Sequence, residues 1–130
     1  MTLYDSSVLI DYLDGLRDTI AYIQDHIDDR AVAPPLVLFE VYQGEVFKTG
    51  PTDLDAVDGA LEWLHVVDVI EGHARVAAEL QDHLAVAGTP LTARDAFVAG
   101  SALALDEPLA VADTDFDIEG LDDLIRIDFL

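Results

Sequence analysis

Four carboxylate side chains stand at positions where chemistry is expected. Asp5 and Asp113 each follow directly after a short apolar stretch that is typical of a strand, and Glu40 and Asp95 each interrupt the apolar stripe of a helical segment. A carboxylate that faces a core is unfavourable unless it is paired or bound to a metal ion. Several such groups repel one another unless a hard divalent cation lies between them. Because the ligands are oxygens, the pattern favours Mg²⁺ or Mn²⁺.

Divalent ions held by these acids would have a definite chemistry. One or two ions can bridge a phosphodiester, generate hydroxide from bound water and neutralise charge on the leaving oxygen. Metal-dependent nucleases work in this way, and the protein then needs few basic groups of its own. The chain has only 6 Lys and Arg residues.

The two acids at the strand ends also have ordinary structural alternatives. Acidic residues number 27 of 130, so some acidic groupings arise by chance. Asp5 could cap the helix that follows it, and Asp113 could begin an Asx turn in Asp-Thr-Asp. Both alternatives stay open at the level of the sequence.

The two acids within helices have alternatives as well. Asp95 stands three residues after Thr92, which is the place of a capping-box partner, although that place prefers Glu or Gln. Glu40 could pair with Arg94 or Arg17. If all four acids had only these structural roles, their placement at one end of one sheet would be a coincidence. A single shared site is the more plausible explanation.

Short strands that alternate with helices must position these acids. Apolar runs predict strands over 1–4, 31–33, 65–70, 109–112 and 125–127, the last as an edge strand. Apolar spacings of three and four predict helices over 8–13 (capped by Ser6 or Ser7), 16–27, 36–47, 54–64, 71–87 and 93–105. This alternation predicts an α/β fold with a mostly parallel sheet of four to five short strands flanked by helices. Ligands of such sheets collect beyond the carboxyl ends of the strands, where Asp5 and Asp113 would lie.

The composition bounds the class of protein. The 130 residues suffice for a single domain, 1–130, and 52% of them are hydrophobic, which is far more than disordered chains carry. Cysteine is absent, which excludes disulfides, thiolate zinc sites and cysteine nucleophiles and fits a reducing interior.

The charge is strongly unbalanced, at −21 from 27 acidic and 6 basic residues. Such a surface repels itself in dilute buffer and becomes tolerable in molar salt, so the composition is typical of a halophile. The basic patch of an ordinary nucleic-acid binder is missing. Bound cations would therefore have to mediate contact with a phosphate substrate.

No segment predicts a membrane span or a secretory signal. The longest nearly uncharged apolar run, 31–39, contains two prolines and is shorter than the ~18 residues that a span needs. Asp5 comes too early, and no basic flank precedes it, for a signal peptide. We therefore expect a cytoplasmic protein without a membrane partner.

Other side chains carry less information. The histidines share no metal-like spacing, so we expect all of them at the surface: His26, His65, His73 and His83. The aromatic residues at helical apolar positions are expected in the core or in a dimer interface: Trp63, Phe39, Phe47 and Phe97. Ser7 has no identifiable His-Asp relay, which argues against a serine hydrolase.

Four segments together resemble a known family. The opening Tyr4–Leu13, the pair Glu40 and Gly44, the stretch Thr92–Leu103 and the stretch Val111–Phe116 resemble the acidic motifs of PIN-domain ribonucleases, particularly VapC toxins of toxin–antitoxin pairs. The similarity spans nearly the whole chain, in the family's order. No single motif is specific, but the set is strong.

The resemblance implies roles for individual acids. Asp5, Glu40 and Asp95 would be catalytic acids that coordinate Mg²⁺ or Mn²⁺, with Asp113 as the fourth. Asp115 is a second candidate for the fourth acid, because this segment departs from the family's commoner form.

The resemblance also implies roles for two neighbours of these acids. Ser6 would contact metal-bound water or phosphate. Arg94 could touch RNA, although a surface or pairing role is the stronger expectation for it.

The resulting hypothesis is a metal-dependent endoribonuclease that acts as the toxin of a type II toxin–antitoxin system. The resemblance further implies a homodimer, an RNA substrate and an antitoxin whose C-terminal segment occludes the acidic pocket. Two alternatives are a PIN-like nuclease of RNA processing or decay without an antitoxin, and an inactive protein-interaction module. A small-molecule phosphohydrolase is weaker, because no Asp-x-Asp follows the first strand.

Overall fold

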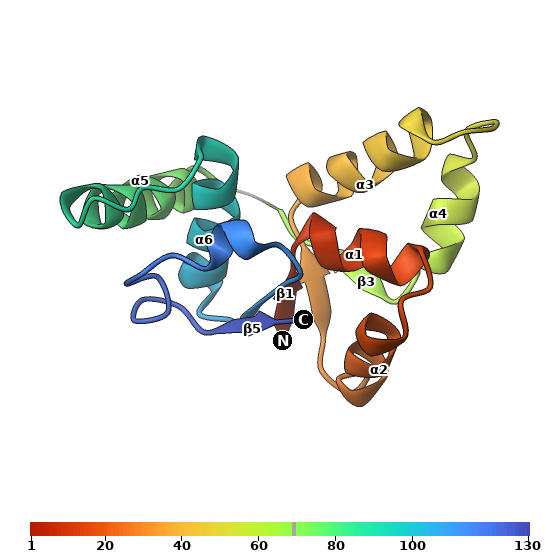
Figure 1. The fold of residues 1–130 in the computed structure, drawn as a ribbon, viewed down its shortest axis with the longest axis horizontal. Coiled ribbons are helices and arrows are strands. Elements are labelled where there is room, and N and C mark those ends of the chain that lie inside the picture. The colour runs from red at the N-terminus through yellow and green to blue at the C-terminus, as the bar shows by residue number, and fades with distance from the viewer. Residues whose placement is uncertain (69) are drawn as a thin grey trace.

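A parallel sheet forms the centre of the fold, with helices on either side of it (Figure 1). The computed structural model describes residues 1–68 and 70–130. Within these residues the sheet has five strands in the order β3-β2-β1-β4-β5, and all neighbours are parallel. The strands are β1 (Thr2–Tyr4), β2 (Ala31–Ala33), β3 (Leu64–Val66), β4 (Leu109–Val111) and β5 (Ile127–Phe129). The predicted α/β fold is confirmed.

The helices form two groups. They are α1 (Ser6–Leu13), α2 (Arg17–Asp25), α3 (Pro35–Phe47), α4 (Leu54–Ala60), α5 (Glu71–Val86) and α6 (Ala93–Leu105), with a short 3₁₀ helix η1 (Thr114–Phe116). Figure 1 shows α1 to α4 on one side of the sheet and α5 with α6 on the other. Among the described residues, none of the helices combines the length and apolarity that crossing a membrane requires.

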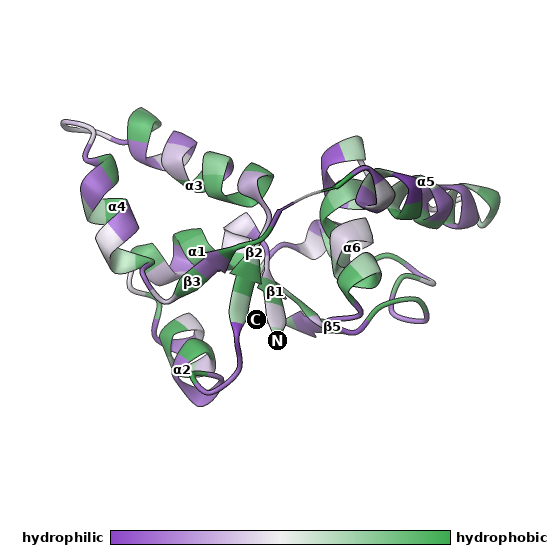
Figure 2. Cartoon of the chain, turned by 180° about the vertical axis from the view of Figure 1, so that it is seen from behind, coloured by the Kyte–Doolittle hydropathy of each residue, from purple (hydrophilic) through white to green (hydrophobic). Residues whose placement is uncertain are grey.

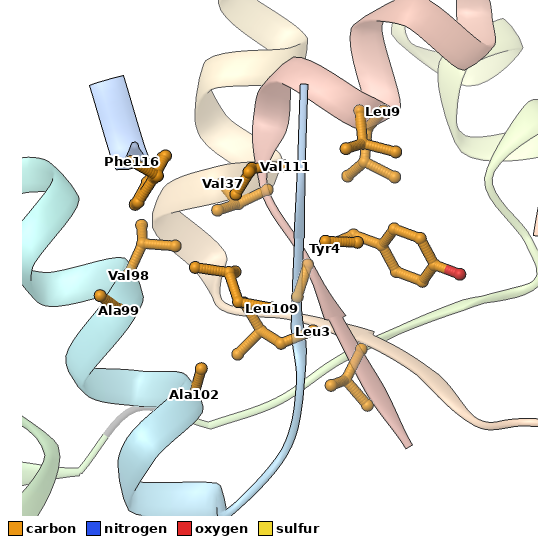
Figure 3. Packing of buried hydrophobic residues seen from close by; sticks show 14 of the residues in the cluster. Leu3, Tyr4, Leu9, Val37, Val98, Ala99, Ala102, Leu109, Val111 and Phe116 are labelled. Carbon is orange, nitrogen blue, oxygen red and sulfur yellow. The ribbon is translucent and has the colours of Figure 1, made fainter. Parts of the chain in front are cut away.

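The central strands are fully buried because helices cover both faces of the sheet. All three residues of β1 and all three of β4 are buried, which explains why β4 is an uninterrupted apolar run and why β1 is apolar apart from Thr2. In Figure 3, Leu109 of β4 lies toward Val98 and Ala99 of α6, whereas Tyr4 of β1 points to the opposite side. The strands β1 and β4 therefore join two halves of one core.

The edge strands differ from their predicted positions. β5 pairs with β4 through Leu109↔Ile127 and Val111↔Phe129, so the strand predicted over 125–127 in fact covers 127–129. Ile125 is buried in the core although it precedes the strand, and its apolar side chain is what misplaced the prediction. An edge strand pairs on one side only, so its boundaries leave a weak pattern in the sequence.

The region between α4 and α5 was also predicted inaccurately. The helix expected over 54–64 ends at Ala60, and Leu64 already belongs to β3. The strand expected over 65–70 is observed over 64–66, and position 69 of that prediction lies outside the described residues. The apolar residues Leu61 and Leu64 continue a helical spacing, but Leu61 has left helical geometry. Figure 2 shows the contrast in hydropathy: the central strand β2 is green (hydrophobic), whereas purple (hydrophilic) residues recur along α4 and α5.

One prediction of burial was wrong, and a second is reduced to one of its two alternatives. His73, expected at the surface, is buried near the start of α5, and its Nδ1 atom has no hydrogen-bond partner among the described residues. Phe39 and Phe47 are 57% and 77% exposed, which excludes the core of this chain and leaves the dimer interface as the prediction for both. Their apolar spacing on α3 does not face the sheet, where Val37 and Val41 are buried instead.

A hydrogen bond connects α2 with the distant strand β5. The Tyr22 hydroxyl donates to Asp128 Oδ2 at 2.6 Å. Next to it, the ring of Tyr4 packs edge-on against Tyr22. Burial, aided by the charges of Asp29 and Asp128, raises the pKa of Tyr4 to about 12. Burial and the bond to Asp128 also raise the pKa of Tyr22.

The raised pKa values of Tyr4 and Tyr22 lead us to expect a loss of stability at alkaline pH. A raised pKa means that the folded chain keeps a proton that the unfolded chain loses, so the contribution of Tyr4 is intact below pH 10.0, the ordinary value, and is lost as pH rises toward about 12. For Tyr4 we expect a loss of roughly 1–2 kcal/mol of unfolding free energy over that range. Urea titrations across this range should show a smaller loss for Tyr4→Phe. An equal loss in both proteins would contradict the assignment.

Candidate functional site

An acidic cavity of about 400 Å³ opens at the carboxyl edge of the sheet. Its lining comes from four separate segments of the chain and consists of Asp5, Ser6, Ser7, Ile10, Glu40, Thr92, Arg94, Asp95, Asp113 and Asp115. Every residue that the sequence singled out as a site residue is among them. The cavity contains five carboxylates and a single guanidinium, so its charge is strongly negative.

The sheet topology explains how these segments meet. The strands β2, β1 and β4 are neighbours, and their carboxyl ends lead into Glu40, Asp5 and Asp113 respectively. Because parallel strands end at the same edge, the three acids arrive on one side of the molecule. The helix α6 runs back toward the start of β4, which brings its first turn, with Asp95, to the same edge.

Asp5 is fixed by the start of α1. Its Oδ2 atom accepts hydrogen bonds from the Ser7 amide at 3.2 Å and from the Ser7 hydroxyl at 2.6 Å. Asp5 is therefore the N-cap of α1, as one alternative held, and the expected cap at Ser6 or Ser7 is wrong. The residue is 1% exposed. Its other oxygen, Oδ1, is buried without a hydrogen-bond partner among the described residues.

Ser7 holds Asp5 in place, a role that sequence reasoning missed. The Ser7 hydroxyl donates to Asp5 and accepts a hydrogen bond from the Ala112 amide at 3.0 Å. It thereby joins the start of α1 to the end of β4. The sequence does show a hydroxyl residue, Ser7, two positions after the capping Asp5. It does not show the second partner of Ser7, because Ala112 lies 105 residues away.

Asp95 is positioned by the cap of α6. The Thr92 hydroxyl accepts a hydrogen bond from the Asp95 amide at 3.2 Å, which fixes the first turn. The carboxylate of Asp95 accepts from Arg94 Nη1 at 2.8 Å and does not act as a capping-box partner of Thr92. Asp95 is 6% exposed, so this charge is held largely away from water at a helix N-terminus, which favours it.

Glu40 lies in the second turn of α3, which begins at Pro35 after the end of β2. Its side chain is 28% exposed, so it is half-buried beside Val41. Both of its carboxylate oxygens accept from Arg94 Nε, at 2.8 and 2.9 Å, and Oε1 also accepts from Nη2. The alternative that Glu40 pairs with Arg94 is confirmed.

Arg94 joins the three acids at the centre of the cavity. Its Nη1 atom lies 2.8 Å from Asp5 Oδ1 and 2.8 Å from Asp95 Oδ1. Its Nη2 atom donates to the Ser6 hydroxyl at 2.8 Å. Burial works to lower the pKa of Arg94, but the hydrogen bonds to Glu40, the charge of Asp5 and the hydrogen bond to Asp95 outweigh it, so the pKa is raised. The pairing role expected for Arg94 is confirmed.

The carboxylates of Asp5, Glu40 and Asp95 are suitable ligands for a hard divalent cation, although the Arg94 guanidinium bridges them in this structure. Within 1–68 and 70–130, no three carboxylates or imidazoles are arranged to share a metal ion as they stand. The available side-chain ligands are oxygens, which suit Mg²⁺ or Mn²⁺. Asp5 Oδ1 is a buried anionic oxygen that lies 2.8 Å from Arg94 Nη1, so a metal ion bound to it would take the place of that ion pair.

Asp113 and Asp115 stand at the rim of the cavity. Asp113 Oδ1 accepts from the Asp115 amide at 2.9 Å and caps η1. The expected Asx turn is therefore present. Asp113 is half-buried and Asp115 is exposed, and both line the cavity without an ion pair to Arg94 among the described contacts.

The sequence matches the family model of the PIN domain over residues 2–118. No curated protein matches the sequence. Several solved structures share its fold. A chain of VapBC2 from Rickettsia felis, bound to a DNA fragment from its promoter, has a TM-score of 0.83 at 13% identity, with 99% of this chain and 98% of that chain covered.

Two further structures are similar over nearly their whole length. A chain of DNA-bound VapBC from Salmonella typhimurium has a TM-score of 0.81 at 20% identity, covering 98% of this chain and 96% of that one. A chain of VapBC-5 from Mycobacterium tuberculosis, a member of the VapBC family of toxin–antitoxin systems, has a TM-score of 0.70 at 24% identity, covering 99% and 96%. At these identities the likeness concerns the fold.

Proposed function

Because the chain belongs to the PIN domain family, whose members are nucleases, we propose that it is a metal-dependent endoribonuclease and the toxin of a type II toxin–antitoxin system. The observation that carries this proposal is the meeting of Asp5, Glu40 and Asp95 around one point of an acidic cavity. These residues are far apart in the sequence, and each is costly to bury alone. Arg94 contacts all three in this structure, and a divalent ion bound to the same oxygens would account for their placement in one cavity.

Asp5, Glu40 and Asp95 would hold Mg²⁺ or Mn²⁺, with Asp113 or Asp115 as a fourth acid at the rim. When bound, the ion would supply Lewis acidity for activating water and for offsetting charge on a scissile phosphate. Ser7 orients Asp5 through its 2.6 Å hydrogen bond. Thr92 orients Asp95 through the first turn of α6. Ser6 and Arg94 offer the cavity a hydroxyl and a cation with which a phosphate can be bound.

The similar structures support the proposal of an antitoxin partner, because several of them come from toxin–antitoxin systems. VapBC-5 is named as a member of the toxin–antitoxin systems, and a chain of a toxin–antitoxin complex from Klebsiella pneumoniae also has this fold, with a TM-score of 0.74. We propose a homodimer that the antitoxin occludes at the acidic cavity. A small open reading frame next to the gene, whose product binds this chain and stops cleavage, is the expected finding. Its absence would favour a nuclease of RNA processing or decay.

The direct test is RNA cleavage by the purified chain in molar KCl. We expect endonucleolytic fragments with Mn²⁺ or Mg²⁺ and intact RNA when EDTA removes the metal. Cleavage that persists at full rate in excess EDTA would contradict a metal-dependent mechanism. A chain that binds no divalent ion and cuts no RNA would favour the inactive interaction module. The ion pairs of Arg94 with the three acids also support that candidate, because they occupy the oxygens that a metal ion would need.

High salt is expected to stabilise the fold. A net charge of −21 on 130 residues opposes compaction, and raising KCl to about 1 M shortens the screening length to about 3 Å. The melting temperature should therefore rise steadily between dilute buffer and molar KCl, by differential scanning fluorimetry. Choline chloride at equal ionic strength tests whether screening alone suffices. A melting temperature that does not respond to either salt would contradict a halophilic character.

A further inference from the structure

We propose that Arg94 is a built-in counter-cation that stands in the place of the divalent ion, and that metal binding must displace it. This inference depends on the proposed function, because it concerns the same acidic cavity. It adds a regulation that is built into the chain: the affinity for metal is set by how firmly Arg94 is held.

The contacts of Arg94 account for the whole guanidinium. Nη1 lies 2.8 Å from both Asp5 Oδ1 and Asp95 Oδ1, Nη2 donates to Ser6 and Glu40, and Nε donates to Glu40. The side chain of Arg94 is 27% exposed, and those of Asp5 and Asp95 are 2% and 9% exposed. One cation thus contacts three carboxylates from three segments of the chain and offsets part of their negative charge. This is the electrostatic task that a divalent ion would perform there.

The two cations cannot share the centre of the cavity. Like charges at contact distance repel strongly in a partly desolvated site, and the same oxygens, Asp5 Oδ1 and Asp95 Oδ1, serve either partner. Asp5 Oδ1 is buried, and its ion pair with Arg94 Nη1 at 2.8 Å is the contact that a metal ion would replace. The long side chain of Arg94 can turn outward while its backbone stays in the first turn of α6.

Displacement changes what Arg94 can do next. It is the only basic side chain among the residues that line the cavity. Once released from the acids, its planar guanidinium stays at the cavity mouth and is suited to bidentate contact with a phosphate. Without metal, the same guanidinium reduces the repulsion among the carboxylates of Asp5, Glu40 and Asp95. Metal binding would therefore convert Arg94 from a structural counter-ion into a group that can bind substrate.

The test measures Mn²⁺ binding by isothermal titration calorimetry in molar KCl for the wild type and for Arg94→Gln. The control is Arg75→Gln, which changes the net charge equally but removes an exposed cation paired with Glu79 on α5. Arg94→Gln should bind Mn²⁺ at least about tenfold more tightly than the wild type, because no internal cation competes. Arg75→Gln should bind like the wild type.

A second readout uses no metal. In EDTA, the melting temperature of Arg94→Gln should fall below that of both other proteins, because the buried carboxylates lose their cation, and saturating Mn²⁺ should remove this difference. If Arg94→Gln does not fold, Arg94→Lys replaces it; a single ammonium cannot bridge all three acids, so tighter Mn²⁺ binding than in the wild type is again expected.

The outcomes separate the two proposals. Equal or weaker Mn²⁺ affinity in the Arg94 variants, with binding preserved in the wild type, would overturn the displacement of Arg94 and leave the proposed metal-dependent nuclease standing. Mn²⁺ binding by none of the proteins would overturn both.

Discussion

Replacing Asp95 by asparagine is expected to reduce RNA cleavage by at least about 10²-fold, the scale of effect seen when one preorganised electrostatic group is removed from an active site. The carboxylate is 6% exposed and shares Arg94 Nη1 with Asp5, so it contributes charge at the centre of the proposed metal site. Asparagine has nearly the same shape but no charge. The measurement is the initial rate of cleavage with Mn²⁺ in molar KCl.

The fold should survive this change. The Thr92 cap of α6 uses the backbone amide of Asp95 and not its carboxylate. Asp5→Asn should behave in the same way, because asparagine is also a good N-cap for α1. Asp18→Asn is a matched control, since Asp18 stands in the first turn of α2 as Asp95 does in α6, but outside the cavity. Cleavage by Asp95→Asn at the rate of Asp18→Asn would exclude Asp95 from catalysis.

Gly100→Val is expected to destabilise the chain by about 2–3 kcal/mol, because it overpacks a helix contact. A Cβ atom on Gly100 of α6 would lie 2.5 Å from both Cα and Cβ of Ala77 on α5 and 2.9 Å from its backbone nitrogen. Backbone atoms cannot rotate away, so the two helices would have to separate. Urea unfolding monitored by circular dichroism measures the loss.

Gly59→Ala is expected to stabilise the chain, in contrast to Gly100→Val. Gly59 lies in the exposed helix α4, and nothing is within 4 Å of the place where its Cβ would be. Alanine there should raise the unfolding free energy by roughly 0.5–1 kcal/mol, since glycine costs about that much in a helix. A Gly100→Val chain as stable as Gly59→Ala would contradict the close packing of α5 on α6.

The acids of the site could be predicted because they break a local pattern. Glu40 and Asp95 interrupt apolar stripes, and Asp5 and Asp113 end apolar strands, so each was visible within a few residues of sequence. The parallel sheet then placed all four at one edge. Central strands were predictable for the same reason, since burial on both faces leaves uninterrupted apolar runs.

The sequence offered the pairing of Arg94 with Glu40 as one alternative, but it did not predict that Arg94 joins three acids and Ser6. Its partners Glu40 and Ser6 lie 54 and 88 residues away, and only the folded chain brings them to one guanidinium. The same holds for Ser7, which joins Asp5 to the end of β4 across 105 residues. Local patterns thus reported which side chains are unusual, whereas their partners depend on topology.

A crystal of this chain grown in high KCl and soaked in Mn²⁺ tests the central claim most directly. The account predicts an anomalous difference peak in contact with the carboxylates of Asp5, Glu40 and Asp95, with the Arg94 guanidinium turned away from them. Manganese peaks confined to other acidic surfaces, with Arg94 still bridging the three acids at saturating Mn²⁺, would contradict it.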